Sequence, residues 1–215
     1  ASARCHDALD VGIRSARIGN SSMVFTAAVF RGEQLLVSGE LVYVFANPAT
    51  QTSLPVPQQL RDIVGAFEAG KPMLDVRVGG WDELGDDART IRTEVFVNEQ
   101  CIPADMEWDS ADAACVHAVA RNQLGMPLAT GRLLEHVPGV AKIGRMAVLQ
   151  PMRGEGTGRA VLDALMARAR QRGDREVLLH AQMSAMPFYL RAGFSKRGDS
   201  FDEAGIAHVE MVRSL

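Results

Sequence analysis

Short stretches of alternating apolar and polar residues open the chain. Leu9, Val11 and Ile13 alternate with polar residues and a glycine, and two similar stretches follow at 21–31 and 34–47. Side chains of a strand point alternately to its two faces, so this two-residue period predicts β-strands. The turns "IGN" and "RGEQ" between them are short enough for hairpins. We therefore expect a three-stranded antiparallel meander within residues 8–47.

The next segment, residues 48–60, breaks this rhythm. It carries three prolines and little apolar periodicity, so it predicts an exit from the sheet, followed by a short helix near Leu60–Phe67. The phrase "AGKP" then marks the best candidate boundary. We expect a first module at 1–68, a linker at 69–73 and a second domain at 74–215.

From Leu74 onward the pattern mixes the two periods. Apolar residues at helical spacing predict one helix through Leu84–Val95 and a second at about 158–171, which Gly173 would end. A shorter helix is expected at 184–193. Strands are expected at 74–79, 115–122, 127–136, 141–149, 176–182 and 207–213. Mixed strands and helices in this order predict an α+β domain.

Three glycines stand directly ahead of the second helix, in "MRGEGTG" at 152–158. Glycine permits close approach to main-chain N–H groups, and the first turn of a helix adds unpaired N–H groups and partial positive charge. The pattern favours an anion site, typically for phosphate, over a plain tight turn, for which one glycine is enough. It matches neither the P-loop nor the dinucleotide spacing.

Arg153–Gly158 matches the [QR]-x-x-G-x-[GA] signature of the GNAT acetyltransferases. "KIGRMAVLQPMRGEGTG" resembles that family's fourth strand and loop, and "AQMSAMPFYLRAGF" resembles its fifth strand and following helix. "IRTEVFVNEQCIPADMEWDSAD", "IGRMAV" and "GIAHVEM" resemble the ElaA-like branch. The resemblance covers roughly 74–215 and implies the GNAT fold, a mixed central sheet flanked by helices.

This resemblance implies acetyl-CoA as co-substrate and no metal. Main-chain groups of the fourth strand would bind pantetheine and polarise the acetyl carbonyl, while their side chains belong to the core. Gln182 stands where many relatives carry asparagine, so a CoA contact is less secure there. For Arg153 and Arg159 the alternative is a solvated surface arginine. The expected CoA-binding residues are Met146, Ala147, Val148, Arg153, Gly154, Gly156, Thr157, Gly158, Arg159 and Gln182.

Acetyl transfer to an amine needs an acid for the leaving thiolate and a base for the ammonium. Tyr189, in "FYLRAGF", matches the position of the family's acid; the alternative is a packed aromatic. Glu99 and His208 are the preferred bases, and Glu107 and His117 are further candidates. The acidic run that contains Asp109 and Asp112 is interpreted as a solvated loop that attracts cationic amines rather than a metal site.

We therefore expect an N-acetyltransferase that uses direct attack by a small-molecule or peptide amine in a ternary complex. No covalent intermediate is needed, so Cys101 and Cys115 would be bystanders. The alternative is a sensor or assembly module that binds CoA without turnover. The identity of the amine stays open, because a fold does not select a substrate.

The meander and its proline-rich exit resemble the last strands of a hotdog-fold acyl-CoA thioesterase of the hydroxybenzoyl-CoA type. That family's central helix and acidic catalytic segment would lie upstream of Ala1, so the chain is expected to be a fragment or processed product, and thioesterase activity is the least favoured function. An uncovered sheet leaves one apolar face bare. We expect it to find cover elsewhere, for example by pairing two copies.

Composition narrows the classes of function that remain for this protein. The net charge is -3, with 47% hydrophobic and 23% charged residues, and no basic patch indicates nucleic acid. The three cysteines lie far apart, which argues against a disulfide framework and favours a reducing, cytoplasmic location. No run of about 18 apolar residues predicts a membrane span.

Overall fold

The computed structural model describes residues 2–215. They form two compact units, one that ends at Met73 and one that spans Leu74–Leu215. Residues 69–73, expected to be a linker, belong to the first unit. No helix within the described residues is long and apolar enough to cross a membrane. Whether the second unit folds alone stays a prediction.

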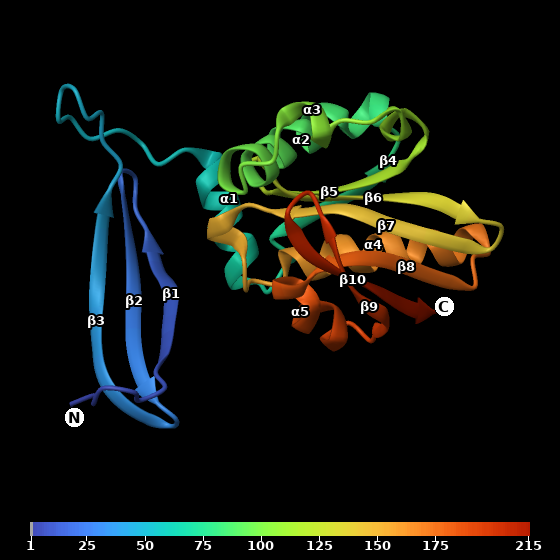
Figure 1. The fold of residues 1–215 in the computed structure, drawn as a ribbon. Helices are drawn as coiled ribbons and strands as arrows, with labels where there is room; N and C mark the ends of the chain where they lie inside the picture. The colour runs from blue at the N-terminus through green and yellow to red at the C-terminus, as the bar shows by residue number, and fades with distance from the viewer. Residues whose placement is uncertain (1) are drawn as a thin grey trace. The chain divides into compact units, whose positions relative to one another are not determined.

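The first unit contains the predicted meander and one helix (Figure 1). Its elements are β1 (Asp10–Ile18), β2 (Ser22–Arg31), β3 (Gln34–Val44) and α1 (Gln58–Glu68). Val11, Val29 and Val37 lie in register across the three strands and so share one face. Val11 and Val37 stay largely exposed. This stretch of apolar sheet is therefore uncovered within the described chain.

The second unit is built on a seven-stranded sheet of order β4-β5-β6-β7-β8-β10-β9. All neighbours are antiparallel except β7 and β8, which are parallel. The strands are β4 (Leu74–Gly79), β5 (Val116–Asn122), β6 (Pro127–Val137), β7 (Val140–Val148), β8 (Glu176–Gln182), β9 (Ser195–Glu203) and β10 (Ile206–Ser214). This mixed sheet confirms the predicted fold class.

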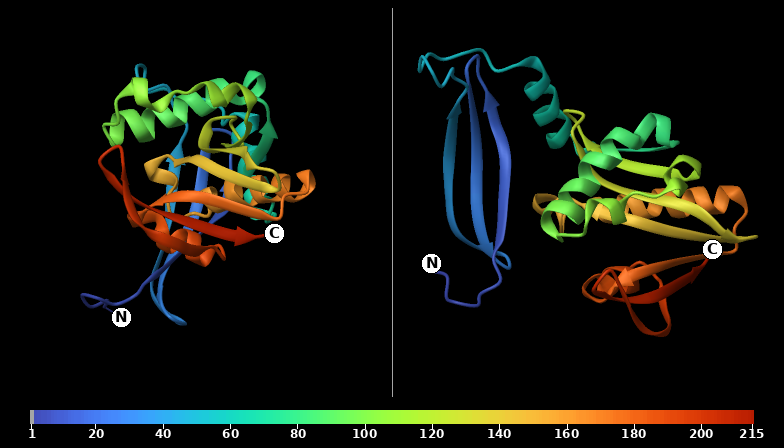
Figure 2. Two further views of the ribbon diagram at one scale, coloured as in Figure 1. Left: turned by 45° about the vertical axis from the view of Figure 1, so that its right-hand side comes forward. Right: turned by 45° about the horizontal axis from the view of Figure 1, so that its top comes forward.

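Helices cover both faces of this sheet. The first, α2 (Trp81–Arg92), continues into a π-helical turn at Thr93–Glu99 and packs Leu84 and Ile91 against Val119 of β5. On the opposite face, α4 (Thr157–Arg172) buries a stripe of apolar residues against Ala118 and Ala120 of the same strand. Figure 2 shows α2 and α4 on opposite sides of the sheet. Shorter helices are α3 (Ala104–Glu107) and α5 (Met186–Arg191).

The sequence did not predict β9. All nine of its residues are exposed and only Phe201 is a large apolar side chain, so its sequence has no alternating apolar pattern. Pairing with β10 forms this strand instead. Its hairpin tip, with Ala204 and Gly205 at positive φ, carries Glu203 toward a cavity described below.

The parallel strands β7 and β8 separate partway along. In the described part of the chain they pair from Val140 to Ile143, opposite Glu176–Leu179, and not beyond. Beside this point β7 bulges against β6, and Arg145 adopts a left-handed φ of 51°. A Cβ at position 131, opposite the bulge, would force the ends of the Met146 and Leu165 side chains to move, so glycine fits there without rearrangement. The resemblance implies this separation, which the sequence alone could not show.

Candidate active site

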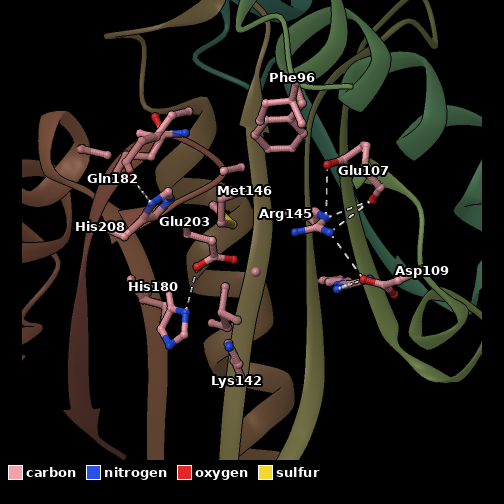
Figure 3. Close-up of a pocket in the computed structure, with 18 of the residues that line it drawn as sticks. Phe96, Glu107, Asp109, Lys142, Arg145, Met146, His180, Gln182, Glu203 and His208 are labelled. Atoms are coloured by element: carbon pink, nitrogen blue, oxygen red, sulfur yellow. Dashed lines mark hydrogen bonds and ion pairs between the residues drawn. The ribbon is translucent and has the colours of Figure 1, made fainter. Parts of the chain in front are cut away.

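Two cavities meet where β7 and β8 separate. One, of about 980 Å³, is bordered by the glycine loop and α5; we call it the loop cavity. The other, of about 570 Å³, lies over the face of the sheet that carries α3 and is lined by many charged side chains; we call it the charged cavity (Figure 3). The residues that line both are Gln100, Met146, Gln182, Ala185, Tyr189 and Ile206.

The conformation and packing of the glycine loop explain why it contains three glycines. Gly154 and Gly156 have φ of 89° and 81°, where side chains other than glycine are strained, and nothing lies within 4 Å of a Cβ built at either position. Gly158 has ordinary φ, but a Cβ there would lie 3.0 Å from Cγ2 of Val148. Two glycines therefore shape an open loop ahead of α4, and the third allows the helix to pack on β7.

The charged residues near this loop are already paired. Arg153 donates from Nη1 and Nη2 to the two Glu99 oxygens at 2.7 and 2.5 Å, and from Nε to the carbonyl of Val148 at 3.0 Å. Arg159 pairs with Asp163 one turn along α4. Arg153, Arg159 and Glu99 all line the loop cavity. Thr157 does not line it: the residue is buried, and its hydroxyl has no hydrogen-bond partner among the described residues.

The expected CoA-binding residues of β7 and β8 border the cavities. Ala147 is buried in the core; Met146 packs against the core, as the sequence predicted for its side chain, and also lines both cavities. Val148 lines the loop cavity. Gln182 donates from Nε2 to Oε1 of Gln100 at 2.9 Å, across the junction of the two cavities.

Tyr189 lies at that junction. Its side chain is 7% exposed, packs edge-on against Phe188 and Phe194, and lines both cavities. Burial raises the pKa of the phenol well above its ordinary value, so it stays protonated at neutral pH. It can therefore donate a proton but cannot easily act as a base.

Of the candidate bases, His208 is best placed. It lines the charged cavity, and its Nδ1 lies 2.8 Å from the carbonyl of Ile206, which can only accept; Nδ1 therefore carries the proton and Nε2 keeps its lone pair. Glu99 lines only the loop cavity, and its hydrogen bonds from Arg153 lower its pKa. His117 is buried under Trp81 and lines neither cavity.

The acidic run was predicted wrongly as a solvated loop. Residues 104–114 form short helical turns in which Glu107 and Asp112 are buried. Their carboxylates, with that of Asp109, alternate with three arginines in a closed ring of ion pairs, the arginine–carboxylate ring, with N–O distances of 2.6 to 3.4 Å. In order around it stand Arg92, Glu107, Arg145, Asp109, Arg132 and Asp112.

The ring has no net formal charge, so it offers no acidic surface to a cationic amine. Arg92, 1% exposed, also lies over the Trp108 ring at 4.6 Å. Hydrogen bonds from Arg132 lower the pKa of Asp109 to about 2, whereas burial raises the pKa of Glu107 despite its partners Arg92 and Arg145. Both Glu107 oxygens face arginines, which makes this carboxylate a poor base.

Several residues of the charged cavity escaped the sequence analysis. Lys142 and His180 come from β7 and β8, and Glu203 is the last residue of the unpredicted strand β9. Lys142 lies on a strand whose alternate residues are core, so its outward direction could have been inferred from the period of two. No sequence signal placed Glu203 beside His180, where their Oε2 and Nδ1 atoms lie 3.1 Å apart.

Comparison with known proteins identifies the second unit. Residues 84–215 match the family described as acetyltransferase (GNAT) domain. The uncharacterized N-acetyltransferase YjcF of Bacillus subtilis is 34% identical over 133 residues, which cover 61% of this chain and 94% of YjcF.

Two solved structures share the fold. An acyl-CoA N-acyltransferase from Pseudomonas aeruginosa is 33% identical with a TM-score of 0.58, over 65% of this chain and 99% of that protein. Escherichia coli ElaA is 25% identical with a TM-score of 0.59, over 66% and 99%. The chain therefore belongs to the GNAT acetyltransferase family, and its activity is acyl-CoA-dependent N-acetyl transfer.

Proposed function

We propose that acetyl-CoA occupies the loop cavity, that a primary amine occupies the charged cavity, and that the amine attacks the acetyl carbonyl where the cavities meet. The observation that carries this proposal is their shared border at Tyr189 and Met146. Two cavities that share lining residues would allow both substrates to be present at once, next to each other.

The diphosphate of CoA would lie at the glycine loop. The first N–H groups of α4 have no partner within the helix, open space lies beside Gly154 and Gly156, and the helix dipole favours an anion there. Arg153 would exchange its Glu99 partner for a phosphate oxygen, since both groups offer the same bidentate geometry. Arg159 and the N–H of Thr157 would add further donors.

The acetyl group would lie in the gap between β7 and β8. The main chain of Met146–Val148 has no pairing partner on β8, so N–H and C=O groups on that side of β7 would bind the pantetheine amides and the acetyl carbonyl; the Val148 carbonyl already accepts a hydrogen bond from Arg153 Nε. Gln182 would assist from the end of β8.

Proton transfers complete the reaction. The amine nitrogen forms a bond to the acetyl carbon, and the carbon–sulfur bond breaks. His208 Nε2 accepts the proton that the ammonium loses before attack, through water where needed, and the Tyr189 phenol gives its proton to the departing thiolate; the proton that the nitrogen loses after attack restores the phenol. Cys115 is buried and, like Cys101, lines neither cavity, in keeping with attack without a covalent intermediate.

The direct test is release of free CoA thiol from acetyl-CoA by the full chain, with and without a panel of primary amines, and with the acetylated product identified by mass spectrometry. We expect release only when an amine is present. Tight CoA binding without amine-dependent release would favour a sensor, and rapid release without any amine would favour a thioesterase.

For the first unit we propose only a hotdog-like origin. Its three-stranded meander agrees with that resemblance, and its uncovered face, which contains Val11 and Val37, is one that a second copy of the chain would cover. No catalytic role is assigned to it. A chain shortened to residues 73–215 should unfold cooperatively and bind CoA as the full chain does; loss of the cooperative transition would show that the first unit completes the fold of the second.

A further inference from the structure

We infer that the charged cavity selects a zwitterionic acceptor, a small primary amine that also carries a carboxylate or phosphate. This inference deepens the proposed function and rests on it. The groups that would recognise such a molecule are Lys142 for the anion and Glu203 for the ammonium.

The argument starts from the charges that are already neutralised. The cavity is lined by Glu107, Asp109, Arg132 and Arg145, all members of the arginine–carboxylate ring. In that ring three guanidinium groups face three carboxylates, so the ring adds no net charge to the cavity. Although four ring residues line the cavity, they therefore do not select a ligand by its net charge.

Lys142 is the exception among the cations. It lies on β7, on the face opposite the buried Ala141 and Ile143, and no carboxylate lies within ion-pair distance of it among residues 2–215. An ammonium group in a partly enclosed cavity without a counter-charge is a binding site for an anion. His136, also in the lining, is another potential cation at this end of the cavity.

Glu203 is the exception among the carboxylates. Whereas Glu107 and Asp109 face arginines, Glu203 faces only the imidazole of His180, whose Nδ1 lies 3.1 Å from its Oε2. A carboxylate whose partner is a titratable ring keeps capacity for a second cation. The ammonium of the acceptor is that cation.

The order of these groups along the cavity fits the reaction. Met146 marks the junction with the loop cavity, and Lys142 lies four residues earlier on the same strand, on the other side of the bulge at Arg145. Figure 3 shows the Glu203 carboxylate between the levels of these two side chains. An acceptor whose ammonium lies near Glu203 would thus present nitrogen toward the acetyl group and its anion toward Lys142.

The experiment compares matched amines. Glycine, β-alanine, 4-aminobutyrate and 5-aminopentanoate are each paired with the alkylamine of equal length, and phosphoethanolamine is paired with ethanolamine; putrescine supplies a dication. With acetyl-CoA and wild-type protein, at least one zwitterion should exceed its partner in kcat/KM at least tenfold. Comparison of the amino acids with phosphoethanolamine shows whether a carboxylate or a phosphate is the preferred anion.

Variants test which residues cause the preference for a zwitterion. Lys142→Gln should abolish the advantage of the zwitterion, mainly through KM, with little change for alkylamines, and Lys142→Arg should retain it. Lys196→Gln, which changes an exposed lysine of β9 outside the cavity, should leave the preference intact. Glu203→Gln should raise KM for zwitterions and alkylamines alike.

A second measurement tests this inference independently of the transfer reaction. Calorimetric titration of the preferred zwitterion into the CoA-bound protein measures binding without turnover, and Lys142→Gln should weaken it at least tenfold. Such binding without thiol release would support the cavity assignment and contradict the transferase proposal. Several results would overturn the inference. They are equal kcat/KM for zwitterions and alkylamines, a preference for putrescine, or an equal loss of kcat/KM for all amines in Lys142→Gln. The absence of both binding and reaction would overturn it as well.

Discussion

The two cavities on either side of the β7–β8 separation are built by different means. The loop cavity is formed by main chain, glycine conformations and a helix start, with one ion pair at its border. The charged cavity is lined by residues of α3, α5, the five strands β6 to β10 and the turn between β9 and β10. Main-chain geometry serves a substrate shared by many enzymes, whereas side chains can change from one enzyme to the next. In the proposed function, the loop cavity thus binds the common substrate and the charged cavity the specific one.

The largest effect should come from the residue that both cavities share. Tyr189→Phe keeps the ring and its packing on Phe188 and Phe194 but removes the proton that the thiolate needs. We expect kcat to fall on the order of 10²- to 10⁴-fold, with little change in CoA affinity. Steady-state kinetics and calorimetry check this. An active enzyme whose variant keeps full kcat would require another acid.

The next largest effect concerns the stability that the arginine–carboxylate ring gives to the fold. Arg92→Met leaves Glu107 and Asp112 buried without their shared cation, which should lower the free energy of unfolding by about 3–5 kcal/mol. Arg89→Met is the matched control, because Arg89 also lies on α2 over Trp81 but pairs with an exposed Asp86. Its cost should stay within about 1 kcal/mol. Urea unfolding measures both, and equal costs would contradict a structural role for the ring.

A third comparison tests the main-chain origin of the loop cavity. Gly156→Val forces a branched side chain into the left-handed region and places it in the open space beside the loop. Loss of charge-assisted contacts to the diphosphate, about 1.5–3 kcal/mol, should weaken CoA binding roughly ten- to hundredfold. Gly173→Val is the control, with φ of 89° at the other end of α4. Unchanged CoA affinity in a folded Gly156→Val protein would exclude the loop as the binding site.

The smallest expected effect is a proton taken up with CoA. Arg153 holds the pKa of Glu99 below its ordinary value of 4.5, so transfer of Arg153 to phosphate should let this pKa rise. CoA binding should therefore take up a fraction of a proton near pH 4.5, and affinity should increase as pH falls through this range. Calorimetry in buffers of different ionisation enthalpy measures the uptake. It should be smaller in Arg153→Gln; equal uptake in both proteins would contradict the exchange.

The contrast also explains what the sequence could predict. The three glycines and the core stripe of α4 were predicted because local conformation and periodicity leave local signals, whereas Tyr189 was named from the family resemblance. The ring was missed because Arg92, Arg132 and Arg145 lie far from one another and from the acidic run in sequence, and the resulting neutralisation depends on the folded chain. Glu203 was missed because exposed strand β9 has no apolar pattern.

The separation of β7 and β8 lay outside such reasoning for another reason. The apolar residues of both strands predict that they are buried, and both are. Periodicity reports which face of a strand is covered, but hydrogen-bond pairing between strands leaves no such mark. Only the register, which ends at Ile143 and Leu179, shows where a substrate can enter.

The central claim is that two cavities hold two substrates at the same time. Initial rates measured at several fixed concentrations of amine, with acetyl-CoA varied, test it most directly. Attack in a ternary complex predicts double-reciprocal lines that intersect, and an enzyme that carries no acetyl group by mass spectrometry when mixed with acetyl-CoA alone. Parallel lines, together with acetyl on Cys101 or another side chain, would contradict it, because one site would then serve the two substrates in turn.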